Sequence, residues 1–512
     1  MNLLSLSIFL PLAGALLVVG IGKQRLAMAI GLAIACLELL LTLAVLWQFN
    51  PEDSGFQLLE QYPWMPSLNA EFFLGVDGIS VLFLPMTALL TLLAIVASWY
   101  AVASFNRLHL ALLLLLEAMT IGVFSALDML LFLVFWQLTL PPIFFLIGLW
   151  GVGAKRRHAA IKYTLFMLFG GVPLLFAIVL LAINHANQIN GSLPQDLSFS
   201  LPILLQTALP DNLQNLIFLL LLLGFAVKAP LVPLHSWLPS TALEAPTQLV
   251  ALLLGLKLGI YGIIRFAMPL APSAAVEFNW LLGILGAITL MYGALIALQQ
   301  TNLRRLLAFA SISHAGLVVI GIAALNMQGI QGAIFQLLNF TIIAGSLMLI
   351  AGFLHQRLGS TELQHLGGLA KTMPKLTAFF FLFVAASIGI PGSNGFPAEL
   401  LLVLGALLGH PSLGITALAG AVLAAAYMLS YSRRAFFGPI TCPANQQASD
   451  LLPREIALLT IPALLVLVLG LWPNGVLGIN KTSTEAWLAR LLEQPSMKGE
   501  ELVELRGMPA SN

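Results

Sequence analysis

Five ionisable side chains lie inside long apolar runs, where a charge is costly unless it faces water or a partner. Lys228 stands in FAVKAPLVPLHSWLP and Lys257 in LLLGLKLGIYG. Glu399 follows the interrupted run SIGIPGSNGFP, His314 lies in SISHAGLVVIG, and Glu117 follows five consecutive leucines. Burial favours the neutral forms of such groups, which prepares them to exchange protons. We therefore predict a buried proton relay built from these five residues.

Each of these residues also has a structural alternative. A buried histidine such as His314 is nearly as often a structural group with satisfied hydrogen bonds, and His235 and Glu244 can simply cap the ends of a broken helix. Lys228 and Lys257 lie too deep in their runs to reach an interface easily. Two buried lysines in successive helices are placed to pass a proton along a hydrated path, and Glu117 is a candidate carboxylate partner for a lysine.

The elements that must position these residues are membrane-spanning helices. The 512 residues are 60% hydrophobic and 8% charged, with a mean hydropathy of +0.99, which excludes a soluble domain. Runs of roughly 20 apolar residues predict an all-α polytopic membrane protein with about 14 transmembrane helices, at 3–21, 27–48, 76–100, 108–126, 128–150, 161–184, 214–238, 247–270, 277–299, 305–325, 330–355, 373–409, 411–434 and 456–478.

The distribution of charge predicts an orientation. The odd-numbered connections carry nearly all the basic residues, and cytoplasmic loops are enriched in Lys and Arg. We therefore expect both termini on the non-cytoplasmic side, with Arg265 as the one basic residue on the wrong side. The basic residues of the odd connections are Lys23, Arg25, Arg107, Lys155, Arg156, Arg157, Arg304, Arg305, Arg357, Lys371, Lys375, Arg433, Arg434 and Arg454.

Two spans are interrupted, and their spacing predicts an internal repeat. The seventh is broken near Pro230 and Pro233, and the twelfth is broken near Pro391 and Pro397. Charged, broken helices at corresponding places in two halves are typical of inverted-repeat transporters. We predict two inverted five-helix repeats, in the division 1–107 for helices 1–3, 108–270 for helices 4–8, 271–434 for helices 9–13, and 435–512 for helix 14 and an amphipathic tail.

The tail after residue 479 alternates charged and apolar residues, which predicts a short interfacial helix. Its charged members are Glu485, Arg490, Glu493 and Lys498, and its apolar members are Trp487, Leu488, Leu491 and Leu492.

Several function classes are excluded by what the sequence lacks. The net charge of +1 gives no reason to expect a nucleic-acid partner. Cys36 and Cys442 are isolated, and there is no nucleotide-binding glycine loop or iron–sulfur motif. We expect no cofactor or metal in this chain, so any redox chemistry must occur in another one.

Five stretches resemble the antiporter-like proton-pumping subunits of respiratory complex I. They are FSALDMLLFLVFWQ, FAVKAPLVPLHSWLP, GLKLGIYGIIRF, LRRLLAFASISHAGLVVIG and GIPGSNGFPAEL. The resemblance covers essentially the full length and extends to subunits of multisubunit cation/proton antiporters and membrane-bound hydrogenases. Glu399 favours the subunit M branch, which is called chain 4 in the NAD(P)H:quinone oxidoreductases of cyanobacteria and chloroplasts.

The resemblance implies roles for the buried residues. Lys228 matches the lysine of the broken seventh helix, Lys257 the connecting lysine of the eighth, His314 the histidine of the central axis and Glu399 the terminal carboxylate. Two positions depart from the pattern: the expected fifth-helix glutamate is Gln137, and an expected eleventh-helix histidine falls at Phe340. Without a carboxylate at 137, either Glu117 substitutes or this chain pumps differently.

The resemblance further implies a membrane-arm subunit of a proton-translocating NAD(P)H or ferredoxin:quinone oxidoreductase. Sister antiporter-like subunits, small membrane subunits and a peripheral redox arm would surround it in a bacterial plasma membrane or a thylakoid membrane. Quinone, iron–sulfur clusters and FMN or ferredoxin would belong to the partner subunits. The alternatives are a specialised paralogue, such as one of a carbon dioxide uptake complex, and a subunit of a multisubunit cation/proton antiporter.

Overall fold

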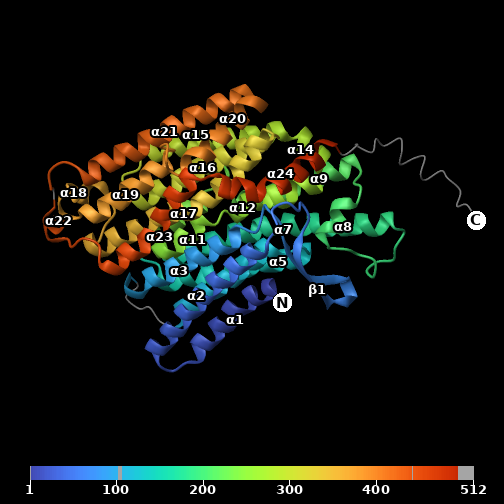
Figure 1. Cartoon of the computed structure of the whole chain (residues 1–512), viewed down its shortest axis with the longest axis horizontal. Coiled ribbons are helices and arrows are strands. Elements are labelled where there is room, and N and C mark those ends of the chain that lie inside the picture. The colour runs from blue at the N-terminus through green and yellow to red at the C-terminus, as the bar shows by residue number, and fades with distance from the viewer. Residues whose placement is uncertain (1, 102–106, 441, 494–512) are drawn as a thin grey trace, which may run out of the picture.

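The computed structural model describes residues 2–101, 107–440 and 442–493, and most of them are helical. Within these ranges, twelve helices are long and apolar enough to cross a membrane. A further span is α3 (Phe83–Ala101), and another is the interrupted pair α19 (Pro374–Ser387) and α20 (Gly395–Gly409). The predicted polytopic fold of about 14 spans is therefore confirmed. Its helices run side by side across the view in Figure 1.

The first segment contains a feature that hydropathy did not predict. Between α1 (Leu3–Gly20) with α2 (Gln24–Gln48) and the third span, the chain forms an antiparallel hairpin of β1 (Gln57–Met65) and β2 (Ala70–Val76), joined by η1 (Pro66–Leu68). The Glu60 carboxylate of β1 accepts hydrogen bonds from the backbone amides of Leu4 and Ser5 at 2.8 and 2.9 Å. The hairpin thereby satisfies the unpaired amides at the start of α1.

Three spans between residues 107 and 270 are interrupted, and one of these breaks was predicted. The fifth span has a one-residue break at Thr139. As predicted, the seventh span breaks after Lys228, where the prolines lie. The eighth span is also broken, at Leu256 and Lys257, and continues through a π-helical turn, which the sequence did not reveal. The elements are α4 (Arg107–Ser125), α5 (Met129–Leu138), α6 (Leu140–Trp150), α7 (Arg156–Gln188), α8 (Leu201–Gln206), α9 (Asp211–Lys228), α10 (Trp237–Glu244), α11 (Thr247–Gly255), α12 (Leu258–Gly262), η2 (Ile263–Ala267) and α13 (Met268–Leu270).

The second repeat has its interruption in the predicted place, between α19 and α20. Gly389 and Gly392 adopt φ values of +67° and +93° there, a conformation that glycine reaches without strain. The other elements are α14 (Pro272–Glu277), α15 (Asn279–Leu298), α16 (Leu303–Ala323), α17 (Met327–Leu358), η3 (Leu363–His365), α18 (Leu369–Thr372) and α21 (Pro411–Phe436). Every residue of α16 except Arg305 is buried, as are most residues of α17, so these two helices form the centre of the molecule (Figure 1).

The last segment differs from the predicted interfacial tail. It comprises α22 (Pro443–Gln447), α23 (Pro453–Leu471) and α24 (Asn474–Glu493), and Lys498 lies outside the described residues. Trp487 and Leu491 of α24 are buried against the protein, because this helix packs on α13, α14 and α17. A helix is present where the tail was predicted, but its apolar residues Trp487 and Leu491 contact neighbouring helices rather than an interface.

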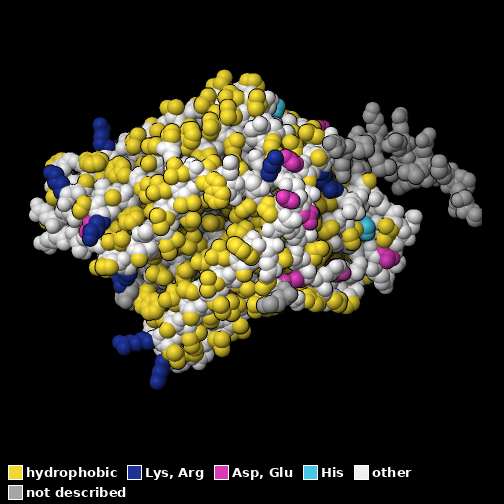
Figure 2. Space-filling view, viewed as in Figure 1, with side chains coloured by type: hydrophobic (Ala, Val, Ile, Leu, Met, Phe, Trp, Pro, Cys, Tyr) yellow, Lys and Arg dark blue, Asp and Glu magenta, His cyan; other side chains and the backbone are white. Residues whose placement is uncertain are grey.

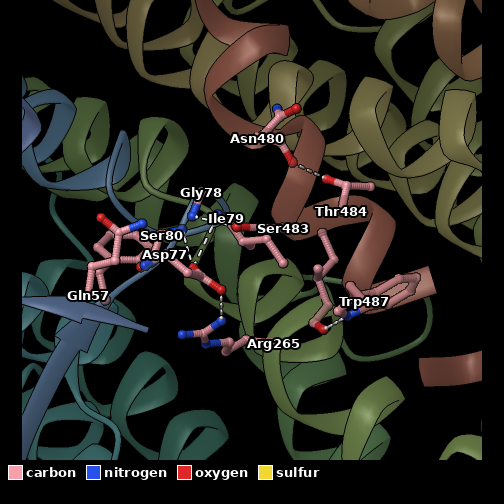
Figure 3. Close-up of polar contacts among 12 residues, drawn as sticks. Gln57, Asp77, Gly78, Ile79, Ser80, Arg265, Asn480, Ser483, Thr484 and Trp487 are labelled. Atoms are coloured by element: carbon pink, nitrogen blue, oxygen red, sulfur yellow. Dashed lines mark hydrogen bonds and ion pairs between the residues drawn. The ribbon is translucent and has the colours of Figure 1, made fainter. Parts of the chain in front are cut away.

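Helix α24 packs at a junction between the first and last parts of the chain (Figure 3). Asp77, in the loop before α3, forms a buried ion pair with Arg265 of η2. The Ser483 hydroxyl accepts a hydrogen bond from the Gly78 amide at 3.0 Å, and the Trp487 indole donates to the Ile264 carbonyl at 2.8 Å. Arg265, which broke the predicted charge pattern, is thus neutralised by a carboxylate.

Charged side chains gather at the two ends of the helices. In Figure 2 most Lys and Arg side chains lie toward the left end, and most Asp and Glu side chains toward the right. The long sides between them are covered by apolar side chains, as expected for surfaces that contact lipid or partner helices.

Candidate functional site

Lys228 ends α9 and faces a small internal cavity. Its amine donates a hydrogen bond to the Thr139 hydroxyl at 3.0 Å and lies 4.0 Å from the centroid of the Trp136 ring. The cavity measures about 30 Å³ and is lined by side chains of α4, α7, α10 and the eighth span, among others. A space of this size accommodates a water molecule beside the amine. The lysine therefore has a neutral hydroxyl partner and, beside it, a space large enough for a water molecule.

Neither of the two positions considered for a carboxylate partner of Lys228, 137 and 117, places a carboxylate in contact with its amine. Position 137 is a glutamine, and a Cβ added to Gly171 of α7 would overlap its amide nitrogen, so the amide is packed against α7. Glu117 forms no hydrogen bond with any described residue and interacts electrostatically with Glu38 of α2. Among the described residues no ion pair joins Lys228 to a carboxylate, and the substitution of Glu117 for the missing glutamate stays a prediction.

Lys257 occupies the unpredicted break in the eighth span. Its amine donates a hydrogen bond to the Ser311 hydroxyl of α16 and lies 5.0 Å from the centroid of the Phe340 ring. Its sequence neighbours Leu256 and Leu258 line the Lys228 cavity, whereas Ser311 and Phe340 line a second cavity of about 30 Å³. Lys257 therefore lies between the two cavities and reaches from the first repeat into the second.

His314 and Glu399 form the far end of the site. The His314 Nδ1 lies 2.8 Å from the Ala310 carbonyl, and its Nε2 lies 3.2 Å from the Ser387 carbonyl and 3.5 Å from Glu399 Oε1. Since both nitrogens face acceptors, the geometry suits the doubly protonated imidazolium, which the carboxylate would neutralise. His314 also lines the second cavity, beside Ser311.

The break in the twelfth span holds Glu399 in place. A Cβ at Gly389 would overlap the Glu399 carboxylate, so the carboxylate lies against the backbone of the break. The break itself is fixed by paired amides: Asn394 donates to Asn339 at 2.7 Å, and Asn339 donates to the Asn394 carbonyl at 2.9 Å. Phe340, at the position of the expected histidine, stacks edge-on against His314.

The structure thus brings together four of the predicted residues and sets one apart. Lys228 lines the first cavity, and Lys257 donates a hydrogen bond to Ser311, which lines the second. His314 also lines the second cavity, and Glu399 lies 3.5 Å from it. These groups can hold and pass protons, because each has a titratable atom beside a polar partner or a space for water. Glu117 lies to the side, on α4.

Sequence reasoning missed Thr139, Ser311 and Glu38. The two hydroxyls gave no signal, since single Thr and Ser residues are ordinary in membrane helices, where they bond the helix backbone. Glu38 did give one: it is a carboxylate in the apolar run CLELLL, as unusual as Glu117. Its 0% exposure shows that it faces inward.

No metal-binding cluster occurs among the described residues, where three or more His, Cys, Asp or Glu side chains nowhere gather closely enough to hold an ion. Of the two cysteines, Cys36 is exposed on α2 and Cys442 is half-buried before α22.

Comparison with known proteins identifies what this arrangement is similar to. Residues 126–424 match the family described as NADH:quinone oxidoreductase/Mrp antiporter, TM. The NADH-quinone oxidoreductase subunit M of Rickettsia conorii is 34% identical over 501 residues, which covers 95% of this chain and 99% of that one.

Two solved structures share the fold. A chain of respiratory complex I from Thermus thermophilus superposes with a TM-score of 0.86 at 31% identity, covering 96% of this chain and 100% of that chain. A chain of the Mrp complex from Dietzia sp. DQ12-45-1b superposes with a TM-score of 0.82 at 24% identity, covering 96% and 99%. The second similarity concerns the fold alone.

Proposed function

Because the chain belongs to the NADH:quinone oxidoreductase/Mrp antiporter family, we propose that it is a membrane-arm subunit of a quinone oxidoreductase and translocates protons through its buried relay. The observation that carries this proposal is the order of contacts from the Lys228 cavity through Lys257 and Ser311 to the second cavity, which His314 lines beside Glu399. No bond other than bonds to hydrogen changes in this chain. The redox reaction belongs to partner subunits.

The relay works by charge coupling between neighbouring groups. The Thr139 hydroxyl orients the amine of Lys228 toward its cavity, and loss of the proton there removes a positive charge from the interior. Like charges repel strongly in a low dielectric, so this loss makes it easier for Lys257 to hold a proton. Lys257 then passes its proton by way of Ser311 and the second cavity toward His314, whose cation Glu399 stabilises.

The partners follow from the same proposal. The electron donor is NAD(P)H or ferredoxin, and quinone, iron–sulfur clusters and FMN belong to the redox subunits. Sister antiporter-like subunits and small membrane subunits cover the apolar sides of the chain. The charge distribution supports an orientation with the basic end in the cytoplasm and both termini on the opposite side of a bacterial plasma membrane or a thylakoid membrane.

A second candidate is a subunit of a multisubunit cation/proton antiporter, because the matching family includes such chains and the Dietzia Mrp chain shares the fold. Gln137 also supports a specialised paralogue, such as one of a carbon dioxide uptake complex. Tagging the chain and identifying its co-migrating proteins separates the three. Iron–sulfur and quinone-module subunits support the oxidoreductase, an additional soluble module supports the paralogue, and polytopic chains alone would remove the redox assignment.

Proton transfer is tested with Lys257→Ala in the assembled complex. We expect proton uptake by inverted vesicles to be abolished, because the substitution removes the only titratable group between the two cavities in the described chain. Lys481→Ala, at an exposed lysine of α24, is the matched control and should leave uptake unchanged. Normal uptake with Lys257→Ala would take this residue out of the mechanism.

Gln137→Glu tests the departure from the family pattern. The glutamine lies in the last turn of α5, two residues before the Thr139 hydroxyl that Lys228 contacts. A carboxylate at this position would give Lys228 an ionised neighbour, so we expect proton uptake equal to or above that of the unmodified chain, with Gln137→Met as the neutral control. A sharp loss with Gln137→Glu alone would show that the chain requires an uncharged residue here.

A further inference from the structure

Two buried carboxylates outside the relay have no partner. Glu38 of α2 is 0% exposed and Glu117 of α4 is 1% exposed. All four of their carboxylate oxygens lack a hydrogen-bond donor among the described residues. An ionised carboxylate without donors is very costly in an apolar interior, so such a group keeps a proton or binds a cation.

Helix packing places the two carboxylates side by side. The start of α4 lies beside the end of α1 and the start of α2, because Arg107 donates to the Val19 and Ile21 carbonyls. The two helices α2 and α4 therefore run in the same direction, and a Cβ at Gly31 of α2 would overlap Leu110 of α4. Glu38 lies seven residues after Gly31 on α2, and Glu117 lies seven residues after Leu110 on α4, which is about two helical turns in each case. Glu38 and Glu117 therefore lie at the same level on the sides where the two helices meet.

No cation on the packed elements neutralises this pair. The helices α1, α3, α5 and α6, which pack on α2 or α4, contain no Asp, Glu, Lys, Arg or His. On α4 the nearest such residue is His109, eight residues or about 12 Å along the helix from Glu117. Apart from the pair itself, the charged or titratable residues on the packed elements are Arg25 and the exposed Cys36 on α2, Tyr100 on α3, Arg107 and His109 on α4, and Glu71 on β2 at the outer end.

The ligand of this pair is a proton rather than a metal ion. A metal ion held by carboxylates takes about six oxygen ligands, and among the described residues no third His, Cys, Asp or Glu joins Glu38 and Glu117. Two adjacent carboxylates in a low dielectric cannot both ionise, so they hold at least one proton between them.

The pair lies next to the first cavity of the relay. Leu116 and Thr120 of α4 line the Lys228 cavity, and Glu117 stands between them in sequence, turned toward α2. A rotation of the Glu117 side chain would bring its carboxyl group toward the cavity without moving the helix. The pair is thus next to residues that line the cavity of Lys228.

We propose that Glu38 and Glu117 form a proton-binding carboxyl pair that exchanges a proton with the Lys228 cavity during turnover. In the step, the O–H bond of one carboxylic acid breaks, and the proton passes through cavity water to the neutral Lys228 amine. One carboxylate and one ammonium result, so charge balances. The pair supplies the titratable carboxyl that α5 lacks at Gln137. The exchange during turnover rests on the proposed function, whereas the proton held at rest does not.

Infrared difference spectroscopy of the whole complex in membranes tests both parts. The carbonyl stretch of a protonated carboxylic acid is separate from that of a carboxylate, and it is followed during a pH titration and during turnover. In the titration, Glu38→Gln/Glu117→Gln should lose a carboxylic-acid signal that the unmodified complex has. Each single variant should change that signal too, because the two groups titrate together. Glu455→Gln is the matched control, since Glu455 is a buried carboxylate paired with Arg357 and far from this pair in the chain, and it should leave the signal unchanged.

The outcomes separate the possibilities. A titration signal unchanged by the double variant would overturn the pair as a proton site. The double variant can also lose the titration signal and still match the unmodified complex in its turnover spectrum and in the ratio of protons pumped to quinone reduced. That result would overturn the proton exchange with the Lys228 cavity. Loss of the turnover signal together with at least a twofold fall in that ratio supports it. If the unmodified complex itself pumps no protons, the proposed function fails while the titration still decides on the pair. Glu38→Gln alone serves if Glu117→Gln fails to assemble, because α2 lies at the edge of the bundle.

Discussion

The buried ion pair between Asp77 and Arg265 should couple the first loop of the chain to the eighth span, and a double-mutant cycle measures the coupling. In Asp77→Asn the side chain keeps an oxygen for the amides of Ile79 and Ser80, which donate to Asp77 Oδ1 at 3.1 and 3.0 Å. The change therefore removes the ion pair and little else. The Arg265 guanidinium remains buried, and its Nε and Nη2 atoms already lack partners among the described residues.

The expected cost is large because a charge is left buried. Breaking one side of a buried pair lowers the free energy of unfolding by about 3–5 kcal/mol. Replacing both partners removes the stranded charge, so Asp77→Asn/Arg265→Met should recover at least about half of that loss. Glu485→Gln removes the exposed pair with Lys481, at 4.0 Å, and should cost no more than about 0.5 kcal/mol.

Unfolding of the detergent-solubilised chain in increasing concentrations of sodium dodecyl sulfate, followed by circular dichroism, gives the four free energies. If the free energy lost in the double variant equals the sum of the losses in Asp77→Asn and Arg265→Met, the two side chains do not interact energetically. Additive costs would therefore refute the reasoning, whatever the size of the single effects.

Two further predictions concern how the relay is positioned. Thr139→Val removes the hydroxyl that Lys228 contacts, and a hydrogen bond to a charged group is worth about 1.5–3 kcal/mol. Proton uptake by vesicles should therefore slow by roughly tenfold or more, whereas Thr139→Ser keeps the hydroxyl and should keep the rate. Equal rates in the two variants would contradict a role for the hydroxyl. Gly389→Ala should strain the backbone by about 1–2 kcal/mol and displace Glu399, whereas Gly392→Ala shares the positive φ but meets no atom within 4 Å. Loss of uptake in the Gly389 variant alone supports the assigned contact, and equal loss in both would assign it to backbone strain.

Local sequence signals predicted the features that have local causes. The prolines after Lys228 predicted a break because proline removes a helix donor, and the Pro391–Gly392 step did the same for the twelfth span. The break at Lys257 has no proline and arises from packing, since a Cβ at Gly259 would overlap the backbone of Ala229. A close approach between distant helices leaves no mark in local hydropathy.

Pairing partners were the second class of feature that could not be predicted. Lys228 could be placed in the membrane from its apolar surroundings, but its contact with Thr139 depends on how α5 meets α9 across 89 residues of sequence. Arg265 looked like an exception to the loop-charge rule because Asp77, the carboxylate that neutralises it, is 188 residues away in the chain. The distribution of charged residues along a sequence predicts the orientation of the spans in the membrane, whereas the fold decides which charged side chains form pairs.

The seat of α24 has a consequence for how the chain is made. Synthesis proceeds from the amino end, so the loop of Gly78 enters the membrane surface long before Ser483 and Trp487 exist. Until the last helix arrives, the Asp77–Arg265 pair lies beneath an uncovered surface. A nascent chain that already holds every residue of the relay is therefore still open at one end. Packing of α24 is therefore a late step of folding, because this helix contacts both the first loop and the eighth span and joins them.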